Sequence, residues 1–347
     1  MSTMRAWVYR TKGKPADVLR LEPDYPKPVP TSSQVLVRVK AAGLNPIGYK
    51  SMYVAPLKFS QKVPSVPEQD VAGVVEGGDL EGTGLKLGDE VFGLLPIQET
   101  NKTCKGALAE YTVIDKANVM RKPASLSFEE TASFPLALLT AYWALVTTGE
   151  LQKGTRVFIN GGSGGVGAYA VQVAKAYGAF VVTTCSPASR DLVSTLGADD
   201  VLDYRASPLP AQLKAKYGNE PFDLVFDTVG ADPSVWHKCS GYLKPKGHYV
   251  DVAGPHMDGS LGSMLSGMTS FMGRMLRPGF LGGVPRKYTF GIMAADRQMV
   301  DAVEELVRAG KVRPIIDSVF AFEHALEAYD RQMSSRAQGK IVVRVEA

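Results

Sequence analysis

A glycine-rich segment in the middle of the chain has the composition of a phosphate-binding loop. Residues 161–167 read Gly-Gly-Ser-Gly-Gly-Val-Gly and follow the apolar run 157–159. Glycines permit a tight turn and let backbone N–H groups approach phosphate oxygens, and a helix behind them offers unpaired donors at the positive end of its dipole. We therefore expect the pyrophosphate of a dinucleotide to bind here, at Gly162, Ser163, Gly164, Gly165 and Val166.

The elements around this loop complete a βαβ unit. Residues 156–160 predict a buried strand, apolar positions from 166 to 177 recur at helical spacing, and 180–184 predict the next parallel strand. The alternative interpretation is a tight strand-to-helix turn that binds no ligand. The complete unit favours the binding site.

The residues after the second strand indicate which dinucleotide would bind. An NAD site usually carries Asp or Glu there, which accepts hydrogen bonds from the ribose hydroxyls. This chain instead continues with Cys185 and Ser186, followed by Arg190. A carboxylate would repel a 2′-phosphate, whereas hydroxyl and guanidinium groups bind it, so the sequence predicts NADPH. In the alternative interpretation, Ser186 caps the next helix and Arg190 is a solvated surface residue.

Two changes in sequence pattern indicate the domains. Up to about residue 125, short apolar runs separated by Pro and Gly predict antiparallel strands, for example at 35–39 and 71–75. From Ser127, a predicted helix N-cap, helices alternate with strands, which indicates a doubly wound parallel sheet. The final predicted strand, 340–345, resembles the first part again. We therefore expect a dinucleotide-binding domain at 126–294, inserted into a β-rich domain formed by 1–125 and 295–347.

Composition narrows the class of protein. The 347 residues carry a net charge of +4 with dispersed Lys and Arg, so no nucleic-acid surface is expected. The three cysteines, Cys104, Cys185 and Cys239, are far apart and fit a reducing compartment. The N-terminus lacks a leader pattern, and no apolar run reaches the roughly 20 residues that span a bilayer. The sequence therefore predicts a cytoplasmic protein without a membrane span.

The residues that bind metals most often show no ligand pattern. All four histidines follow the glycine loop without ligand spacing, and the chain has no set of four closely spaced cysteines. We expect no metal. Without a Lewis acid, oxidation of an unactivated alcohol is not expected, because nothing would stabilise the alkoxide.

With these residues in view, the chain resembles the medium-chain dehydrogenase/reductase superfamily. The similarity is greatest to its zinc-independent quinone oxidoreductase branch, in particular the fungal and mitochondrial reticulon-interacting oxidoreductase group. Nearly the whole chain takes part, through seven segments in order: AAGLNP at 41–46, VPEQDVAGVV at 66–75, GDEVFG at 88–93, GALAEY at 106–111, the glycine loop, LGAD at 196–199 and GK at 339–340.

This resemblance implies a fold, a reaction and a set of partners. The fold is α/β, with a Rossmann-type doubly wound parallel sheet inserted in a β-rich GroES-like catalytic domain. The reaction is NADPH-dependent hydride transfer to a quinone or to the activated C=C of an enone, without zinc, in a cleft between the domains. A small apolar substrate and a homodimer, often formed through the edge of the cofactor-domain sheet, are also implied.

The resemblance also implies roles for single residues. Similar enzymes hold the 2′-phosphate with a Ser and a basic residue after the second strand, here Ser186 and Arg190. They add a Tyr after the third strand, which matches Tyr204, and basic residues near the C-terminus, which match Arg336 or Lys340. The Asn-Pro motif near the nicotinamide falls on Asn45 and Pro46.

Four positions depart from patterns in this superfamily. The acidic residue that often follows Asn-Pro is Gly48 here, and a glycine is replaced by Glu68. Both changes bear on the local shape of the substrate pocket. Asn45 and Gln69 stand where the zinc-dependent members carry Cys and His.

Reduction of an enone requires little from the protein. Hydride goes to the β carbon, and the developing enolate oxygen needs hydrogen bonds and then a proton. Asn45 could donate such a hydrogen bond, and Tyr49 and Tyr53 are candidate proton donors. In the alternative interpretation both tyrosines pack against the fold and water supplies the proton.

Other functions remain open at this point. Within enzymes the alternative is a 2-enoyl thioester reductase, and from another class it is a non-catalytic NADPH-binding redox sensor or scaffold. The Met- and Gly-rich segment 256–287 is interpreted as a pocket wall, a dimer contact or a packed loop.

Overall fold

The computed structural model describes residues 2–54, 59, 61–254, 262, 267, 269, 272–274, 283–291 and 293–345. Contacts divide the chain into two units, Met1–Leu139 with Ala294–Ala347, and Thr140–Met293. The first break lies inside helix α6 (Pro135–Tyr142). Residues 126–139 group with the first unit because α5 (Phe128–Ala132) packs against strands of its sheet.

The first unit is rich in antiparallel strands, as the sequence predicts. Strand β1 (Thr3–Tyr9) pairs with β2 (Leu19–Pro26). The other described strands of this unit form a seven-stranded sheet in the order β14-β15-β3-β4-β5-β7, with β6 paired to β3. The last strand runs antiparallel to β3, so the end of the chain completes the sheet that its beginning started. The bounds of the seven strands are β3 Gln34–Leu44, β4 Asp70–Gly78, β5 Glu90–Leu94, β6 Tyr111–Asp115, β7 Val119–Arg121, β14 Ile316–Ala321 and β15 Lys340–Arg344.

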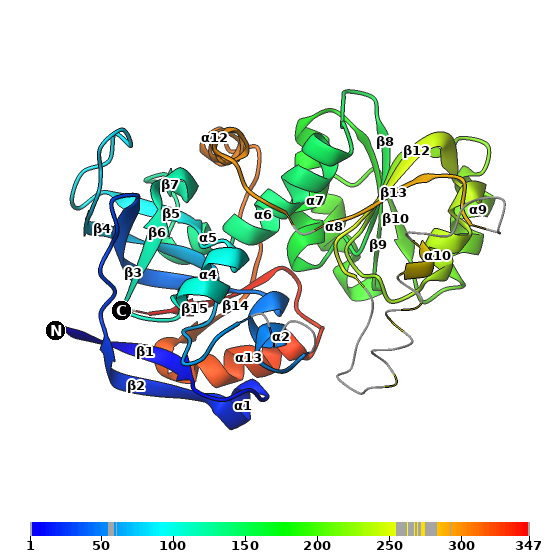
Figure 1. The fold of residues 1–347 in the computed structure, drawn as a ribbon. Coiled ribbons are helices and arrows are strands. Elements are labelled where there is room, and N and C mark those ends of the chain that lie inside the picture. Colours follow the sequence, from blue (N-terminus) through cyan, green and yellow to red (C-terminus); the bar gives the residue numbers. More distant parts are fainter. Residues whose placement is uncertain are drawn as a thin grey trace. The chain divides into compact units, whose positions relative to one another are not determined.

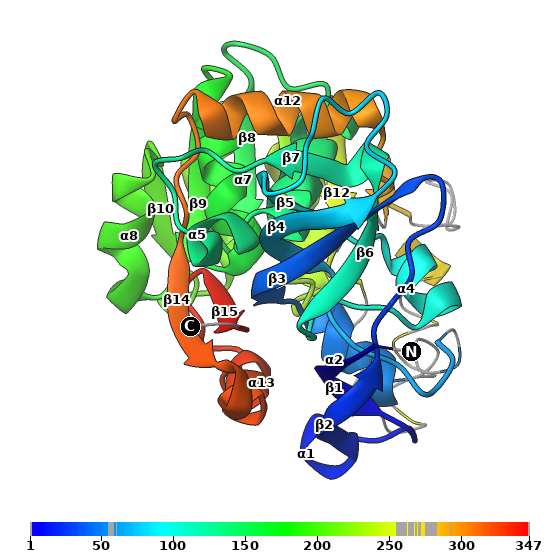
Figure 2. The same cartoon turned by 90° about the vertical axis from the view of Figure 1, so that its left-hand side faces the viewer.

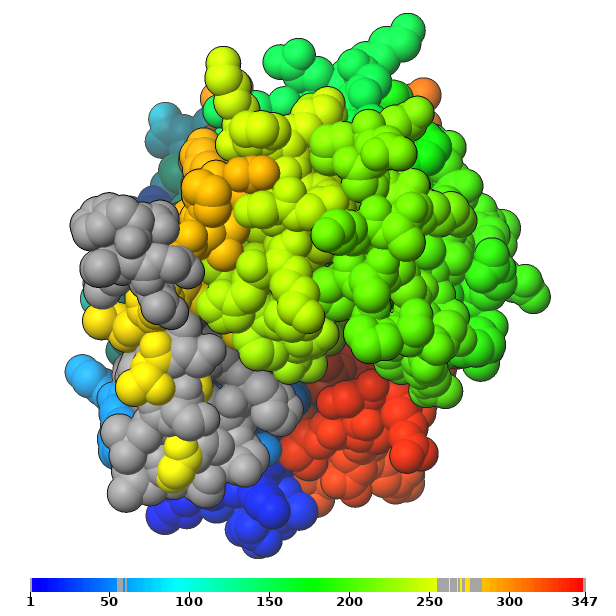
Figure 3. All heavy atoms as spheres, turned by 90° about the vertical axis from the view of Figure 1, so that its right-hand side faces the viewer, coloured from blue at the N-terminus to red at the C-terminus, as the bar shows by residue number. Residues whose placement is uncertain are grey.

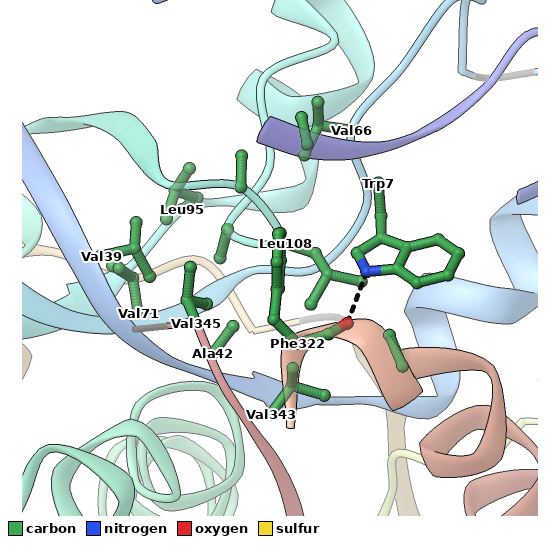
Figure 4. Packing of buried hydrophobic residues seen from close by; sticks show 14 of the residues in the cluster. Trp7, Val39, Ala42, Val66, Val71, Leu95, Leu108, Phe322, Val343 and Val345 are labelled. Atoms are coloured by element: carbon green, nitrogen blue, oxygen red, sulfur yellow. Dashed lines mark hydrogen bonds between the residues drawn. The ribbon is translucent and has the colours of Figure 1, made fainter. Parts of the chain in front are cut away.

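Helices surround this sheet and close its core. The Trp7 indole Nε1 donates a hydrogen bond of 2.8 Å to the carbonyl of Phe322, and both side chains pack among buried valines, leucines and alanines (Figure 4). Helix α12 packs beside β7 (Figures 1 and 2). The described helices of this unit are α1 Pro15–Val18, α2 Pro46–Tyr53, α4 Ile97–Thr103, α5, α12 Arg297–Arg308 and α13 Ala325–Met333, with the short turns η1 Lys116–Asn118 and η6 Phe322–His324.

The second unit contains the predicted parallel sheet. Its six described strands are all parallel and lie in the order β10-β9-β8-β11-β12-β13. Strands β8, β9 and β11 are buried along almost their whole length, as expected for a sheet covered on both faces. The bounds are β8 Arg156–Asn160, β9 Phe180–Cys185, β10 Asp200–Asp203, β11 Phe222–Asp227, β12 Leu243–Asp251 and β13 Lys287–Phe290.

Helices cover both faces of this sheet, which confirms the doubly wound class. Figure 1 shows α7 and α8 on one face and α9 and α10 on the other. In the space-filling view from the right-hand side of Figure 1, the yellow-green atoms of the part of the chain that holds α9 and α10 form much of the surface (Figure 3). The bounds are η2 Trp143–Thr148, a π-helix, α7 Gly165–Ala176, η3 Pro187–Ser189, α8 Arg190–Thr195, α9 Leu209–Tyr217, α10 Ser234–His237 and η4 Cys239–Gly241.

Candidate functional site

The order of the parallel strands points to one edge of the sheet as a candidate ligand site. From β8 the chain moves outward through β9 to β10, and it then returns to place β11 on the other side of β8. Loops after β8 and β11 therefore leave in opposite directions. In open parallel sheets, ligands bind outside the carboxyl ends of the strands at this reversal. The glycine-rich loop follows β8, at the reversal itself.

Two glycines of the loop are packed so closely that a side chain would not fit there. Gly161 donates its N–H to Thr184 Oγ1 at 2.8 Å, and Gly162 donates to the Thr184 carbonyl at 2.9 Å. A Cβ atom on Gly162 would lie 2.1 Å from Thr183 Oγ1, and one on Gly167 would lie 2.0 Å from the Gly161 carbonyl oxygen. Backbone alone therefore fits at Gly162 and Gly167.

Helix α7 begins directly behind this loop. Gly164 is its N-cap residue in an extended conformation, and no side chain within the described residues caps it. Gly165 and Val166 form the first turn, where N–H groups have no acceptor inside the helix. Such a terminus, combined with the close-packed glycines, fits the pyrophosphate of a dinucleotide. Ser163 lies in the same loop, between Gly162 and Gly164.

Three side chains that the sequence analysis missed connect the strands beneath the loop. Asn160, at the end of β8, donates through Nδ2 to Asp227 Oδ1 at the end of β11, at 2.9 Å. Its Oδ1 accepts from Thr184 Oγ1 of β9 at 2.8 Å. All three are buried, so the network fixes the carboxyl ends of three adjacent strands. Each of these residues occupies one of the last two positions of its strand. A polar residue at the carboxyl end of a buried strand is the sequence signal that could have identified them.

The residues predicted to bind the 2′-phosphate gather at the neighbouring strand ends. Cys185 of β9 lies opposite Asp203 of β10 in the sheet register, so Ser186 and Tyr204 follow adjacent strands at the same edge. The Ser186 Oγ lies 3.3 Å from Ser189 Oγ and makes no helix-capping hydrogen bond, unlike in the alternative interpretation. These positions suit a group that lies beyond the edge of the sheet.

Two arginines accompany them. Arg190 is exposed, and its Nη1 donates to the Val201 carbonyl of β10 at 3.2 Å, which holds the guanidinium near these strand ends. Arg205, which the sequence analysis did not single out, has its guanidinium carbon 5.4 Å from the centre of the Tyr204 ring. The Tyr204 side chain is itself exposed. Hydroxyl, aromatic and guanidinium groups are thus present at one edge of this sheet.

In the first unit, Asn45 belongs to a buried polar network. Its Nδ2 donates to Asp70 Oδ2 at 2.9 Å, and its Oδ1 accepts from Lys340 Nζ. Lys340 Nζ also donates to the Leu44 carbonyl at 2.8 Å and to Asp70 Oδ2 at 3.0 Å. Asn45, Asp70 and Lys340 are each less than 5% exposed. Both polar atoms of the Asn45 amide are therefore engaged inside the protein.

The two C-terminal basic residues lie in different surroundings. Lys340 is 4% exposed and surrounded by three oxygen acceptors, whereas Arg336 is on the surface. A phosphate could reach Arg336 without a rearrangement of the fold. In this structure the Lys340 ammonium instead holds β15 to the end of β3 and to Asp70 at the start of β4.

Glu68 is a fully buried carboxyl group beside this network. Its Oε1 accepts from the Tyr329 hydroxyl at 2.7 Å, and its Oε2 accepts from the Asn45 backbone N–H at 3.0 Å. Burial raises the pKa of Glu68 to about 8, against the lowering effect of these hydrogen bonds and of Lys340. Its backbone φ of 72° lies in the left-handed region. For a residue other than glycine, such a conformation costs of order 1 to 3 kcal/mol.

Tyr49 and Tyr53 lie one turn apart on α2. Their rings are stacked with centroids 6.3 Å apart, and both pack against the core of the first unit. Burial raises the pKa of both hydroxyls, so each keeps its proton at neutral pH. Their packing fits the structural interpretation, and a role as proton donor stays a prediction.

Known proteins that resemble this chain place it in a family. The description "Alcohol dehydrogenase GroES-like domain" matches residues 31–124, and "Zinc-binding dehydrogenase" matches residues 196–343. The NAD(P)H oxidoreductase RTN4IP1, mitochondrial, of Danio rerio is 37% identical, over 99% of this chain and 92% of the relative. This chain belongs to the medium-chain dehydrogenase/reductase superfamily.

Two further members of this superfamily show the range of named activities. The trans-enoyl reductase pgmF of Aspergillus terreus is 34% identical, over 99% of this chain and 97% of the relative. The structure of the quinone oxidoreductase from Coxiella burnetii superposes with a TM-score of 0.80 at 26% identity, over 99% of this chain and all of that one. As a member of this NAD(P)H-dependent oxidoreductase family, the chain is an oxidoreductase of α/β fold, and the resemblance predicted from the sequence is confirmed.

Three further expectations concern metal ligands, the segment 256–287 and membrane-spanning helices. Among the residues that the structure describes, no group of three or more His, Cys, Asp and Glu is arranged to hold a metal ion. His237, His248 and His324 are described, and His256 is not. Most of the segment 256–287 also lies outside the described residues. Within the described part of the chain, no helix has the length and apolar character needed to cross a membrane.

Proposed function

We propose that this chain is a zinc-independent, NADPH-dependent reductase that transfers hydride to a quinone or to the activated C=C of an enone. The observation that carries the proposal is the close-packed glycine loop at the strand-order reversal, which fits a dinucleotide pyrophosphate. Relatives named as a trans-enoyl reductase and a quinone oxidoreductase support the two acceptor classes. Both acceptors take hydride at an electron-poor carbon or oxygen and require no Lewis acid.

The preference for NADPH rests on the carboxyl ends of β9 and β10. Ser186, Arg190, Tyr204 and Arg205 offer hydroxyl, guanidinium and aromatic groups there, and the position after β9 carries no carboxylate. Guanidinium groups bind phosphate through paired hydrogen bonds. A 2′-phosphate would therefore meet the guanidinium groups of Arg190 and Arg205, with the Asp203 carboxylate at the end of the neighbouring strand β10.

The residues of the first unit would then hold the substrate oxygen and supply the proton. A bound NADPH supplies the hydride. Tyr49 and Tyr53 hold protons at neutral pH, as an acid that protonates an enolate must. The Asn45 side-chain amide is hydrogen-bonded to Asp70 and Lys340. We therefore assign Asn45 a structural role, in which it positions the Asn-Pro turn ahead of α2. Pro46, the first residue of α2, fixes the entry into that helix.

The proposal makes zinc unnecessary. Position 45 carries Asn and position 69 carries Gln, and neither side chain is a thiolate or imidazole ligand of the kind that holds catalytic zinc. The developing negative charge on an enolate can be stabilised by hydrogen bonds alone.

The proposal extends to location and assembly. We retain a cytoplasmic location from the sequence, although RTN4IP1 relatives are named mitochondrial. A homodimer is proposed through β13, which is the last strand in the order of the described six-stranded sheet. Light scattering of the purified chain would give its mass in solution.

Initial rates of NADPH oxidation test the function and separate its alternatives. The acceptors would be a quinone, an alkyl enone and an enoyl-CoA, at matched concentrations. Turnover of the quinone or enone supports the proposal. A kcat/KM that is highest for the enoyl-CoA would favour the 2-enoyl thioester reductase. The relative named trans-enoyl reductase supports this alternative. Tight NADPH binding without turnover of any acceptor would favour the redox sensor or scaffold.

A further inference from the structure

The N-terminus of helix α2 lacks a cap from its own residues. Asn45 is the N-cap residue, but its side chain makes no capping hydrogen bond. In a capping box, an acidic side chain three residues into the helix accepts the N–H of the N-cap residue. That position in α2 is Gly48, which has no side chain.

Helix α5 of the same chain shows the usual solution. Ser127 is its N-cap residue, and Glu130, three residues on, accepts the Ser127 N–H through Oε2 at 2.7 Å. The Ser127 Oγ in return accepts the Glu130 N–H at 3.1 Å. The acid and the N-cap residue thus lie within one helix.

In α2 the acid comes from a different part of the chain. The Asn45 N–H donates to Glu68 Oε2 at 3.0 Å, which is the bond that Glu130 makes in α5. A Cβ atom on Gly48 would lie 2.0 Å from Glu68 Oε1 and 2.5 Å from its Cδ. The Glu68 carboxyl group therefore occupies the space in which a side chain at position 48 would begin. The two unusual residues of the sequence, Gly48 and Glu68, thus form one arrangement.

Glu68 also ties α2 to a third element. Its Oε1 accepts the Tyr329 hydroxyl of α13 at 2.7 Å, and the side chain is completely buried. The left-handed backbone at Glu68 would suit glycine better. A residue in such a conformation persists where its surroundings determine it. The hydrogen bonds to α2 and α13 are what determine it here.

We propose that Glu68 is a positioning residue: it caps α2 in place of a side chain at position 48 and thereby sets the placement of Asn45, Tyr49 and Tyr53. This role rests on the proposed reductase function, because it acts through residues assigned to that reaction. It predicts that an acid at position 48 can replace an acid at position 68, and that both together cannot be accommodated.

A swap of the two residues tests this directly. The variants are Glu68→Gly, Gly48→Glu, and the double variant Gly48→Glu/Glu68→Gly. We expect Glu68→Gly to lower kcat about 10- to 100-fold, as misplacement of a reacting group does, and to leave KM for NADPH within about twofold. Gly48→Glu alone should lose activity and stability, because its side chain enters the space of the Glu68 carboxyl. The double variant should recover most of both.

Two controls separate positioning from general stability. Glu68→Gln should retain activity, because its amide oxygen can accept the Asn45 N–H while its amide nitrogen donates to the Tyr329 oxygen. Glu130→Ala removes the equivalent cap of α5. It should lower the unfolding midpoint but should not lower kcat, unlike Glu68→Gly. If Glu68→Gly does not fold, recovery of a folded, active chain by the swap supports the proposal equally.

The proposal would be overturned if the double variant were no better than Glu68→Gly while Glu68→Gln remained active. A wild-type chain without turnover would overturn the proposed function and with it the positioning role. The unfolding midpoints of the wild type, Glu68→Gly, Gly48→Glu and the double variant would still test the cap, because capping affects the stability of the fold.

Discussion

At the residue scale, Arg190 is the side chain on which the choice of cofactor most depends. We expect Arg190→Ala to raise KM for NADPH about tenfold, because a charge-assisted hydrogen bond contributes about 1.5 to 3 kcal/mol and about 1.4 kcal/mol is a factor of ten. KM for NADH, which has no 2′-phosphate, should change little. Arg308→Ala, at an exposed arginine of α12, is the matched control. Equal losses for both cofactors would contradict the assignment.

Tyr49 and Tyr53 make a prediction that depends on the acceptor. If either hydroxyl protonates the enolate, Tyr→Phe at that position should lower kcat for an enone by about 100-fold or more. A quinone accepts its protons from water more readily, so its turnover should stay near the wild-type value. Single variants and the double variant would be measured on both acceptors. Unchanged enone turnover in the double variant would leave water as the proton source.

Glu68 should make stability depend on pH. Burial raises its pKa to about 8 in the folded chain, against 4.5 as the reference value. Between these values the folded state holds a proton that the unfolded state has released, so the free energy of unfolding falls as pH rises. The slope from one proton is at most about 1.4 kcal/mol per pH unit. The groups that face the carboxyl are the Tyr329 hydroxyl, Lys340, Asp70 and the Asn45 N–H.

Chemical unfolding of the wild type and of Glu68→Gln between about pH 5 and 8 would measure this. The difference between the two chains should change in favour of Glu68→Gln as pH rises, because the amide does not titrate. A difference that stays constant, or that moves the other way, would show that Glu68 is ionised throughout.

Single residues were predictable where their signal is local in the sequence. The position of the glycine loop after β8 could be predicted because its glycines lie together, and Ser186 and Arg190 could be placed after β9 because they follow one strand. Their roles in cofactor binding stay predictions. The role of Glu68 was not, because its partners are Asn45 and Tyr329, which lie 23 and 261 positions away. Arg205 was missed because only the structure stacks it on Tyr204. The burial of Lys340 could not be predicted, because a Gly-Lys pair does not distinguish a buried lysine from an exposed one; its role at the cofactor stays a prediction.

At the scale of elements, the turn from β8 to α7 is the feature that binding requires. Gly162→Ala would place a methyl group 2.1 Å from Thr183 Oγ1, so the loop must move away from β9. We expect Kd for NADPH to rise at least about tenfold, because the first-turn N–H groups then no longer face the phosphates together. Fluorescence titration would measure it.

The matched control for that substitution is Gly77→Ala in β4. A Cβ there would lie 3.9 Å from Leu36 atoms, an ordinary contact, so binding should be unchanged. Similar affinities for NADPH in Gly162→Ala and the wild type would contradict the assignment of the loop.

Helices and strands were predictable where the apolar pattern runs over many residues. The residues at which they end were harder to predict. Continuous apolar runs predict the parallel strands. Ser127 is the N-cap residue of α5, as the sequence predicts. Residues 234–241, for example, form the short helix α10 followed by the separate turn η4 rather than one continuous helix. The end of the helix changes because the Tyr242 carbonyl accepts from the Phe222 N–H at 2.8 Å, a long-range bond that draws the chain into the sheet.

At the scale of the whole molecule, the two units follow from the change in sequence pattern and from the return of β15 to β3. Alternating elements predict a parallel sheet, and separated apolar runs predict an antiparallel one. What sequence order does not give is the strand order. The reversal between β8 and β11 favours a binding site over a simple turn at the glycine loop, and only the sheet pairings reveal this reversal.

The most direct test of the central claim is a comparison of kcat/KM with NADPH and NADH for the wild-type chain. It would use the best acceptor of the panel, with and without a metal chelator. We predict at least about a tenfold preference for NADPH, the factor that one phosphate contact of about 1.4 kcal/mol supplies, and rates unchanged by the chelator. A preference for NADH, or activity that the chelator abolishes and zinc restores, would contradict the account.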